Sequence, residues 1–353
     1  MISNARVFES KKFLREPKLN NFPDCDYFYP FSRQGLYVYL KGKKYKTVLL
    51  PSYVAEGVFD PFKELGYKIT FYDVNENGYL SSSIFENSVD VFVYIHYFGL
   101  YNESNLALIK EYQNCFSLFV EDFSHIVYHG SLRLNGDIGL FSFTKIFGVT
   151  EGSCIKFNIL EAGNAEYVEN RTISSKLRRI LYWNKVLESY CKNIKINGCL
   201  AKCLSVIGLK DYYSLLMSSY RDNYPSMSTI SFNVLSRLDM EMVVRIRKHY
   251  AMMYLDGLHP RLLLDIPRSY YEKEALFAFP IKVRNRDLFI KILKKSGIIV
   301  LTLTNRWWFN EQGDKSLYNS HVLLPINHNL KEKSVKKVIK RVNEVFVKIG
   351  NNE

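Results

Sequence analysis

One stretch of the chain, from Phe116 to Asn158, places a carboxylate, a hydroxyl and an amine close to the ends of apolar, strand-like runs. The first run ends in the acidic pair Glu121-Asp122, and a second run, Ile138 to Phe143, brings Ser142 and Lys145 to its end. Pyridoxal 5'-phosphate (PLP) needs such a set: a lysine for a Schiff base, a carboxylate beside the pyridine nitrogen, and hydroxyl or backbone donors for the phosphate. The residue types therefore predict a PLP site.

The same stretch resembles the sugar aminotransferases of the DegT/DnrJ/EryC1/StrS family, which are fold-type-I enzymes that use PLP. The elements that carry the resemblance follow the family's order and are Glu121-Asp122-Phe123-Ser124-His125, Gly136-Asp137, Phe141-Ser142-Phe143, Lys145 and Gly152. Further matching pieces are Ser32-Arg33-Gln34-Gly35-Leu36, Leu49-Leu50-Pro51-Ser52-Tyr53, His96-Tyr97-Phe98-Gly99 and Leu323-Leu324-Pro325-Ile326. The resemblance covers most of the chain and is weakest over residues 160 to 220.

The resemblance implies a role for each residue at a matching position. Lys145 would form the Schiff base, and Asp122 would keep the pyridine nitrogen protonated. Ser124 would lie against one face of the ring. His125 stands where the family often has a glutamine that bonds the 3-oxygen of the ring. Because Lys145 is a lysine, where the family's dehydrating members have a histidine, the resemblance favours transamination.

Two separate pieces of the chain are expected to meet at the cofactor phosphate. Ser32, Arg33 and Gln34 open a predicted helix, whose free N–H groups and dipole suit an anion. Ser142 matches the family serine whose hydroxyl also reaches the phosphate. The family's Asn-Tyr-Arg-Met stretch, which contacts the phosphate in the neighbouring subunit, is altered here to Asn223-Tyr224-Pro225-Ser226-Met227 and lacks the arginine.

Four further residues are candidates for contact with the substrate, and each is equally expected as a packing residue. Tyr53 and His96 follow predicted strands, and either of them, or Tyr97, could also stack on the cofactor ring. Arg306 and Trp307 belong to a predicted aromatic and basic loop that suits a sugar or a phosphate.

Size and segment pattern predict the architecture. The chain has 353 residues, of which 47% are hydrophobic and 24% charged, enough for one large and one smaller folded unit. Helix-like and strand-like segments alternate between residues 32 and 158. Ser32 is expected to cap the first helix, and the other predicted segments include a helix from Tyr53 to Leu65 and strands at Lys68 to Tyr72, Val89 to Ile95 and Phe116 to Val120. This alternation predicts an α/β fold with a mostly parallel sheet and a site at the carboxyl ends of its strands. A further long helix is expected to begin near Met227. We expect a large PLP-binding domain at residues 1–225 and a small α+β domain at residues 226–353.

Charge and cysteine content narrow the choice of partners and location. The formal net charge is +13, but lysine and arginine are dispersed and no nucleic-acid motif accompanies them. A solvated surface, or attraction of phosphate-bearing substrates, explains this charge without nucleic acid. No apolar run could span a bilayer and no signal-like segment opens the chain, so we expect a cytoplasmic protein. The six cysteines, with no CxxC pair, predict reduced core thiols and neither a disulfide framework nor a metal site.

These inferences predict an aminotransferase that converts a keto sugar nucleotide to an amino sugar with glutamate as the amino donor. The resemblance also implies a two-fold homodimer, because fold-type-I sites are generally built at a dimer interface. Two alternatives stay open. The chain could be a PLP enzyme of another reaction type on the same fold, or a binding or scaffold protein that has lost turnover.

Overall fold

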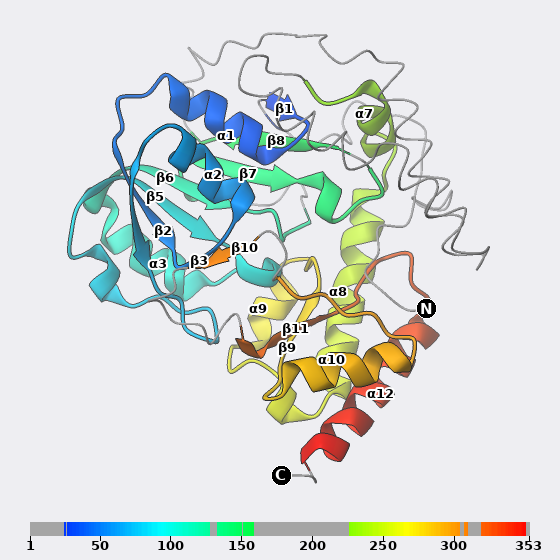
Figure 1. Ribbon diagram of the computed structural model, residues 1–353. Helices are drawn as coiled ribbons and strands as arrows, with labels where there is room; N and C mark the ends of the chain where they lie inside the picture. Colours follow the sequence, from blue (N-terminus) through cyan, green and yellow to red (C-terminus); the bar gives the residue numbers. More distant parts are fainter. Residues whose placement is uncertain are drawn as a thin grey trace.

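The centre of the computed structural model is a seven-stranded sheet with the strand order β1-β8-β7-β6-β5-β2-β4 (Figure 1). Its strands are β1 (Tyr27–Tyr29), β2 (Thr47–Pro51), β4 (Lys68–Tyr72), β5 (Val89–Ile95), β6 (Phe116–Asp122), β7 (Ile138–Ser142) and β8 (Ser153–Phe157). The strands β4, β2, β5, β6 and β7 run parallel, whereas β8 and β1 run antiparallel to their neighbours. This mixed, mostly parallel sheet confirms the predicted α/β class. The structure describes residues 25, 27–127, 133–149, 151–158, 226–303, 307–309 and 319–350.

The central strands form where the sequence has continuous apolar runs. The last five residues of β5 are all buried, as expected for a parallel strand covered on both faces. The bounds of β4 and β5 are those predicted from the sequence. β6 runs further than expected and includes Glu121 and Asp122, which are buried in spite of their charge. The carboxylate pair is therefore part of the sheet and does not lie in a loop after it.

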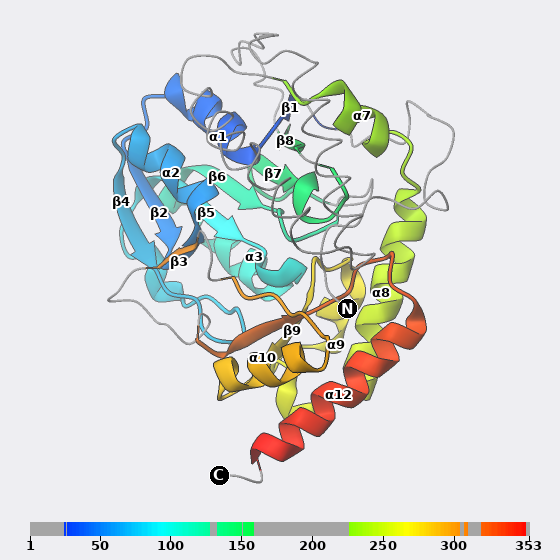
Figure 2. The same ribbon diagram turned by 45° about the vertical axis from the view of Figure 1, so that its right-hand side comes forward.

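Helices α1 (Ser32–Lys41) and α2 (Glu56–Glu64) pack against each other over the sheet (Figures 1 and 2). The residue that caps α1 is Phe31, so Ser32 is the first helical residue and not the cap that its type suggested. The Oε1 atom of Gln34 accepts the backbone N–H of Phe31 at 3.2 Å, which fixes this helix start.

The helix that was predicted to begin at Tyr53 begins later in the structure. The segment Tyr53–Ala55 is a short strand, β3, and the helix α2 begins only at Glu56. β3 pairs antiparallel with β10 (Trp307–Phe309), with Phe309 opposite Tyr53. Aromatic and β-branched residues suit a strand, but the partner lies so far along the chain that no local pattern shows the pairing.

The C-terminal part contains α7 (Thr229–Leu235), α8 (Met240–Gly257), α9 (Arg268–Lys273), α10 (Arg286–Lys295) and α12 (Glu332–Gly350), with a two-stranded sheet of β9 (Phe279–Lys282) and β11 (His321–Leu324). The long helix expected from Met227 is divided, because Asp239 starts α8 anew by accepting the N–H of Met242 at 3.1 Å. α12 packs its apolar stripe against α8 and α10 (Figure 2). One hydrophobic core extends from the large sheet into these elements.

Helix α3 (Glu103–Glu111) links the sheet to this C-terminal part, since the Ser104 and Tyr270 hydroxyls lie 2.9 Å apart. None of the described helices is long and apolar enough to cross a membrane.

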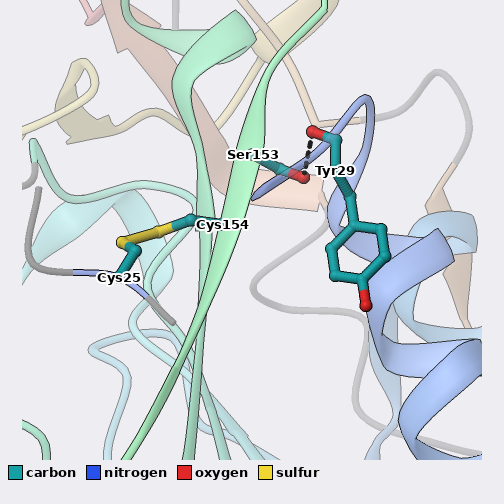
Figure 3. Close-up of a disulfide and its surroundings, with 4 residues drawn as sticks. All are labelled: Cys25, Tyr29, Ser153 and Cys154. Carbon is teal, nitrogen blue, oxygen red and sulfur yellow. Dashed lines mark hydrogen bonds between the residues drawn. A yellow bond between two sulfur atoms is a disulfide. The ribbon is translucent and has the colours of Figure 1, made fainter. Parts of the chain in front are cut away.

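Cys25 and Cys154 form a disulfide, which corrects the expectation of reduced thiols for these two cysteines, whereas Cys115 is a free thiol as expected (Figure 3). Pairing of β1 with β8 sets Phe28 opposite Cys154 and brings the segment before β1 alongside, with 6.1 Å between the two cysteine Cα atoms. The hydroxyl of Ser153 donates to the backbone oxygen of Tyr29 at 3.0 Å and supports the same pairing. Since 129 residues separate the two cysteines, only the folded sheet shows that they are partners.

Candidate active site

The carboxyl ends of β2, β5, β6 and β7 meet at one edge of the sheet, and most residues predicted to do chemistry lie there. Asp122 ends β6, with Ile95 of β5 and Leu140 of β7 as its register partners. Ser142 ends β7, and Lys145 ends the 3₁₀ turn η6 (Phe143–Lys145) that follows directly. Because adjacent strands are about 4.8 Å apart, a carboxylate, a hydroxyl and an amine share this edge.

Asp122 is 3% exposed and is held by the loop that follows it. Its Oδ1 atom accepts the backbone N–H of Ser124 at 2.8 Å. No described residue forms a hydrogen bond to the other oxygen, Oδ2. This oxygen could therefore accept a hydrogen bond from a protonated pyridine nitrogen while the first keeps the carboxylate in place. Ser124 is also buried, directly after this turn.

His125 is fixed on three sides. Its Nδ1 atom accepts the backbone N–H of Phe98 at 3.2 Å, and its backbone oxygen accepts the N–H of Phe277 at 2.9 Å. The imidazole stacks on the Phe277 ring at 5.1 Å between centroids. Burial, and then the positive charge of Lys145, hold the pKa of His125 well below its usual range. The ring is therefore neutral, and the accepted bond at Nδ1 assigns the proton to Nε2, which makes His125 a hydrogen-bond donor at that atom.

The residues after His96 form the turn η4 (Tyr97–Gly99), which places the backbone N–H of Phe98 beside the imidazole of His125. Phe98 has a φ of 63°, in the left-handed region that residues with a side chain rarely adopt, and Gly99 has a φ of 91°. A side chain on Gly99 would collide with the backbone oxygen of His125. This close approach is what directs the Phe98 N–H at the imidazole.

Lys145 is half-buried in a turn that is bonded at both ends. The N–H of Phe143 donates to the oxygen of Gly152 at 3.0 Å, and the N–H of Ile146 donates to the oxygen of Phe143 at 3.1 Å. The side chains of Phe143 and Phe147 are buried beside this turn. These buried rings and backbone bonds fix the turn that presents Lys145, whose amine is a nucleophile of the kind a Schiff base needs.

Arg247 of α8 is a residue of this region that sequence reasoning missed. Its side chain is 2% exposed. The guanidinium Nη2 donates to the oxygen of Ile146 at 3.3 Å, and Nη1 donates to the oxygens of Leu276 at 2.9 Å and Phe277 at 3.1 Å. A signal was available in the sequence, because Arg247 interrupts an apolar stripe in which Val243, Tyr250, Ala251 and Tyr254 are buried.

The start of α1 and the end of β7 lie at the same edge of the sheet. Tyr29 is paired with Ser153, which is paired in turn with Ser142, and α1 begins three residues after Tyr29. The hydroxyl of Ser142 lies 3.3 Å from that of Thr144 and is partly exposed. Two serines, Ser32 and Ser142, and the first turn of a helix thus offer donors for an anion.

The side chains of Arg33 and Gln34 are engaged elsewhere. The Nη1 atom of Arg33 lies 3.3 Å from Oδ2 of Asp60 in α2, and the Gln34 side chain is buried in the helix cap described above. Their contribution to anion binding would come from the main chain. The altered stretch from Asn223 to Pro225 lies outside the described residues.

His96, a predicted substrate residue, is completely buried. Its Nε2 atom lies 3.0 Å from Oε1 of Glu121, and its ring is stacked between Phe123 at 4.5 Å and Tyr101 at 5.2 Å. The other oxygen of Glu121 accepts two backbone N–H groups, of Asn135 and Gly136, each at 2.6 Å. His96 therefore belongs to a packed pair behind Asp122 and does not reach a substrate in this arrangement.

Tyr53 is also buried, with its ring parallel to that of Tyr97 at 6.1 Å. Its hydroxyl donates to the oxygen of Leu303, and the hydroxyl of Tyr97 donates to the oxygen of Tyr53. Trp307 lies in β10 opposite Ala55, not in the loop that the sequence suggested, and Arg306 lies outside the described residues.

Comparison with known proteins places the fold but gives no sequence match. No family model and no curated protein matches this chain. Solved structures do match. PseC of Helicobacter pylori, an aminotransferase of pseudoaminic acid biosynthesis, has 16% identity and a TM-score of 0.60, with 96% of this chain and 94% of PseC covered. DesV of S. venezuelae, solved with a ketimine intermediate, has 16% identity and a TM-score of 0.60, covering 95% and 91%. The PLP form of Spr1654 from Streptococcus pneumoniae has 13% identity and a TM-score of 0.61, covering 97% and 94%. At these identities the likeness shows the fold-type-I aminotransferase fold and confirms that prediction.

Proposed function

We propose that the protein is a PLP-dependent aminotransferase that acts on a sugar. The observation that carries the proposal is the placement of Asp122, Ser142 and Lys145 at the carboxyl ends of two adjacent parallel strands, with the buried imidazole of His125 three residues after Asp122. A chance surface lysine would have neither the carboxylate at the adjacent strand end nor the imidazole beside it. The shared fold with solved aminotransferases supports the same reading.

The residues present fit the cofactor in kind and in place. The available Oδ2 of Asp122 would keep the ring nitrogen protonated, and the Nε2–H of His125 would donate to the ring oxygen. Ser142, Ser32 and the first turn of α1 would hold the phosphate. Once bound, PLP supplies a carbonyl group that reacts with amines and a ring that accepts electrons. Lys145 would attach it covalently and, when displaced, would use its amine to take and return the proton of the amino donor.

The sugar substrate that we propose is a keto sugar nucleotide, and the amino donor is glutamate. The support for this assignment is the resemblance in sequence, the part that the similarly folded PseC plays in pseudoaminic acid biosynthesis, and the net charge of +13, which favours phosphate-bearing substrates. A homodimer is proposed on the same resemblance, since a fold-type-I site is generally completed by the partner subunit.

A half-reaction tests the function without knowledge of the sugar. Protein saturated with PLP is mixed with glutamate, and the absorbance of the bound cofactor and the release of 2-oxoglutarate are followed. We expect the amino group to pass to the cofactor with one 2-oxoglutarate released per site. Cofactor binding without transfer from glutamate or any other amino acid would favour the scaffold alternative. Release of carbon dioxide or of an aldehyde would favour another PLP reaction type.

A further inference from the structure

We propose that Arg247 is a positioning residue of the cofactor site, which fixes the backbone on both sides of it from helix α8. One guanidinium holds the peptide that follows Lys145 and the backbone segment, Leu276 and Phe277, that packs against His125. This inference rests on the proposed function, because it concerns how the two residues are presented to the cofactor.

The first contact holds the turn that ends at Lys145. The Ile146 N–H is bonded to the oxygen of Phe143 at 3.1 Å, and its own oxygen accepts from Nη2 of Arg247 at 3.3 Å. The residue that directly follows Lys145 is thus held at its amide and at its carbonyl. Without the guanidinium this carbonyl, at the end of the turn that carries Lys145, would lose a charged donor.

The second contact holds the backbone segment that packs against the imidazole of His125. Nη1 of Arg247 donates to the oxygens of Leu276 and Phe277. The N–H of Phe277 in turn donates to the oxygen of His125 at 2.9 Å, and its ring stacks on the imidazole. The neighbouring oxygen of Ala275 accepts the N–H of Val127 at 3.0 Å, so the segment pairs with the chain on the far side of His125 as well.

The guanidinium is suited to this task in a way that other side chains are not. Its planar fork has donors that point in different directions, and here they reach backbone oxygens from two separate segments. Nε donates to Nδ1 of His328 at 3.3 Å and sets the plane of the fork. A buried charge is costly unless its hydrogen bonds are made, so placing an arginine in an otherwise apolar stripe is explained by the contacts it makes.

The test uses three full-length variants loaded with PLP: Arg247→Gln, Arg247→Lys and, as a matched control, Arg245→Gln. Arg245 is exposed on the same helix two residues away. The readouts are the rate at which borohydride fixes the cofactor to Lys145, found by peptide mass spectrometry, and the amide hydrogen exchange of Ile146, Phe147 and Phe277. All measurements are made well below the melting temperature of each variant.

We expect Arg247→Gln to slow labelling of Lys145 at least about tenfold, as the loss of one charge-assisted hydrogen bond implies, and to speed amide exchange at the three named positions. Arg247→Lys, which keeps the charge but not the fork, should recover part of both effects, and Arg245→Gln should match the wild type. Normal labelling and exchange in Arg247→Gln would overturn the positioning role. If Arg247→Gln does not fold, the lysine variant decides by the same two readouts. A wild type that is never labelled on Lys145 would instead refute the proposed function.

Discussion

His125 and Lys145 lie close enough for the charge of the lysine to act on the imidazole. Burial and then this charge keep the pKa of His125 well below its usual range, and the hydrogen bond from Phe98 settles which nitrogen carries the proton. In the sequence these residues are 20 positions apart. The fold brings them together because β6 and β7 are parallel neighbours that end at the same edge.

A depressed histidine pKa makes stability depend on pH. In the unfolded chain His125 should titrate near pH 6.5, whereas in the fold it titrates at lower pH, so between these values the unfolded state binds more protons. We expect the free energy of unfolding to fall below about pH 6.5, by up to ~1.4 kcal/mol per pH unit, and the contribution to be constant above it. Urea unfolding of the wild type and His125→Gln across this range tests the effect. The same dependence in both proteins would show that His125 does not cause it.

Asp122 should matter for chemistry more than for structure. Asp122→Asn keeps an oxygen that can accept the Ser124 N–H, but the neutral amide cannot hold a proton on the pyridine nitrogen. We expect cofactor to bind still and the glutamate half-reaction to slow about 100-fold or more. Asp90→Asn is the matched control, because Asp90 accepts the N–H groups of Lys46 and Thr47 at the opposite edge of the sheet. Equal rates in Asp122→Asn and wild type would remove Asp122 from the cofactor site.

The pair of His96 and Glu121 should be structural. Glu121→Ala would leave the buried His96 and the N–H groups of Asn135 and Gly136 without their acceptor. Breaking a buried pair of this type costs about 3–5 kcal/mol, so the melting temperature should fall sharply. A variant with normal stability and a raised KM for the sugar would restore His96 as a substrate contact.

Because of the disulfide, the free energy of unfolding should depend on whether Cys25 and Cys154 are oxidised or reduced. Reduction, or Cys25→Ser, should lower the free energy of unfolding by about 2–4 kcal/mol, because the link joins distant parts of the chain. Urea titrations with and without dithiothreitol measure this, and Cys25→Ser should not respond to the reductant in the same way. Alkylation of both Cys25 and Cys154 in unreduced, denatured protein would contradict the pairing.

The extent to which structure follows from sequence differs between elements for physical reasons. The strands β4 and β5 were predicted with correct bounds because their side chains alone mark a buried strand. The strand at Tyr53 and the disulfide were not, since each depends on a partner more than 100 residues away.

In the candidate site, too, residues marked by local sequence could be predicted, and residues whose role depends on distant contacts could not. Asp122, Ser142 and Lys145 could be assigned to strand ends because the apolar run before each of them marks the strand. Arg247 stands out in its apolar stripe, but its contacts could not be predicted, because they are backbone oxygens, which no residue type in the sequence identifies. The burial of His96 could not be predicted either, since it depends on the rings of Tyr101 and Phe123, which lie against it only in the fold.

The most direct test of the account is the position of the covalent cofactor. Protein saturated with PLP is reduced with borohydride, digested and mapped by mass spectrometry, alongside Lys145→Ala treated identically. The account predicts one pyridoxyl group, on Lys145, and none in the variant. A group on another lysine, or no group at all under saturating cofactor, would contradict it.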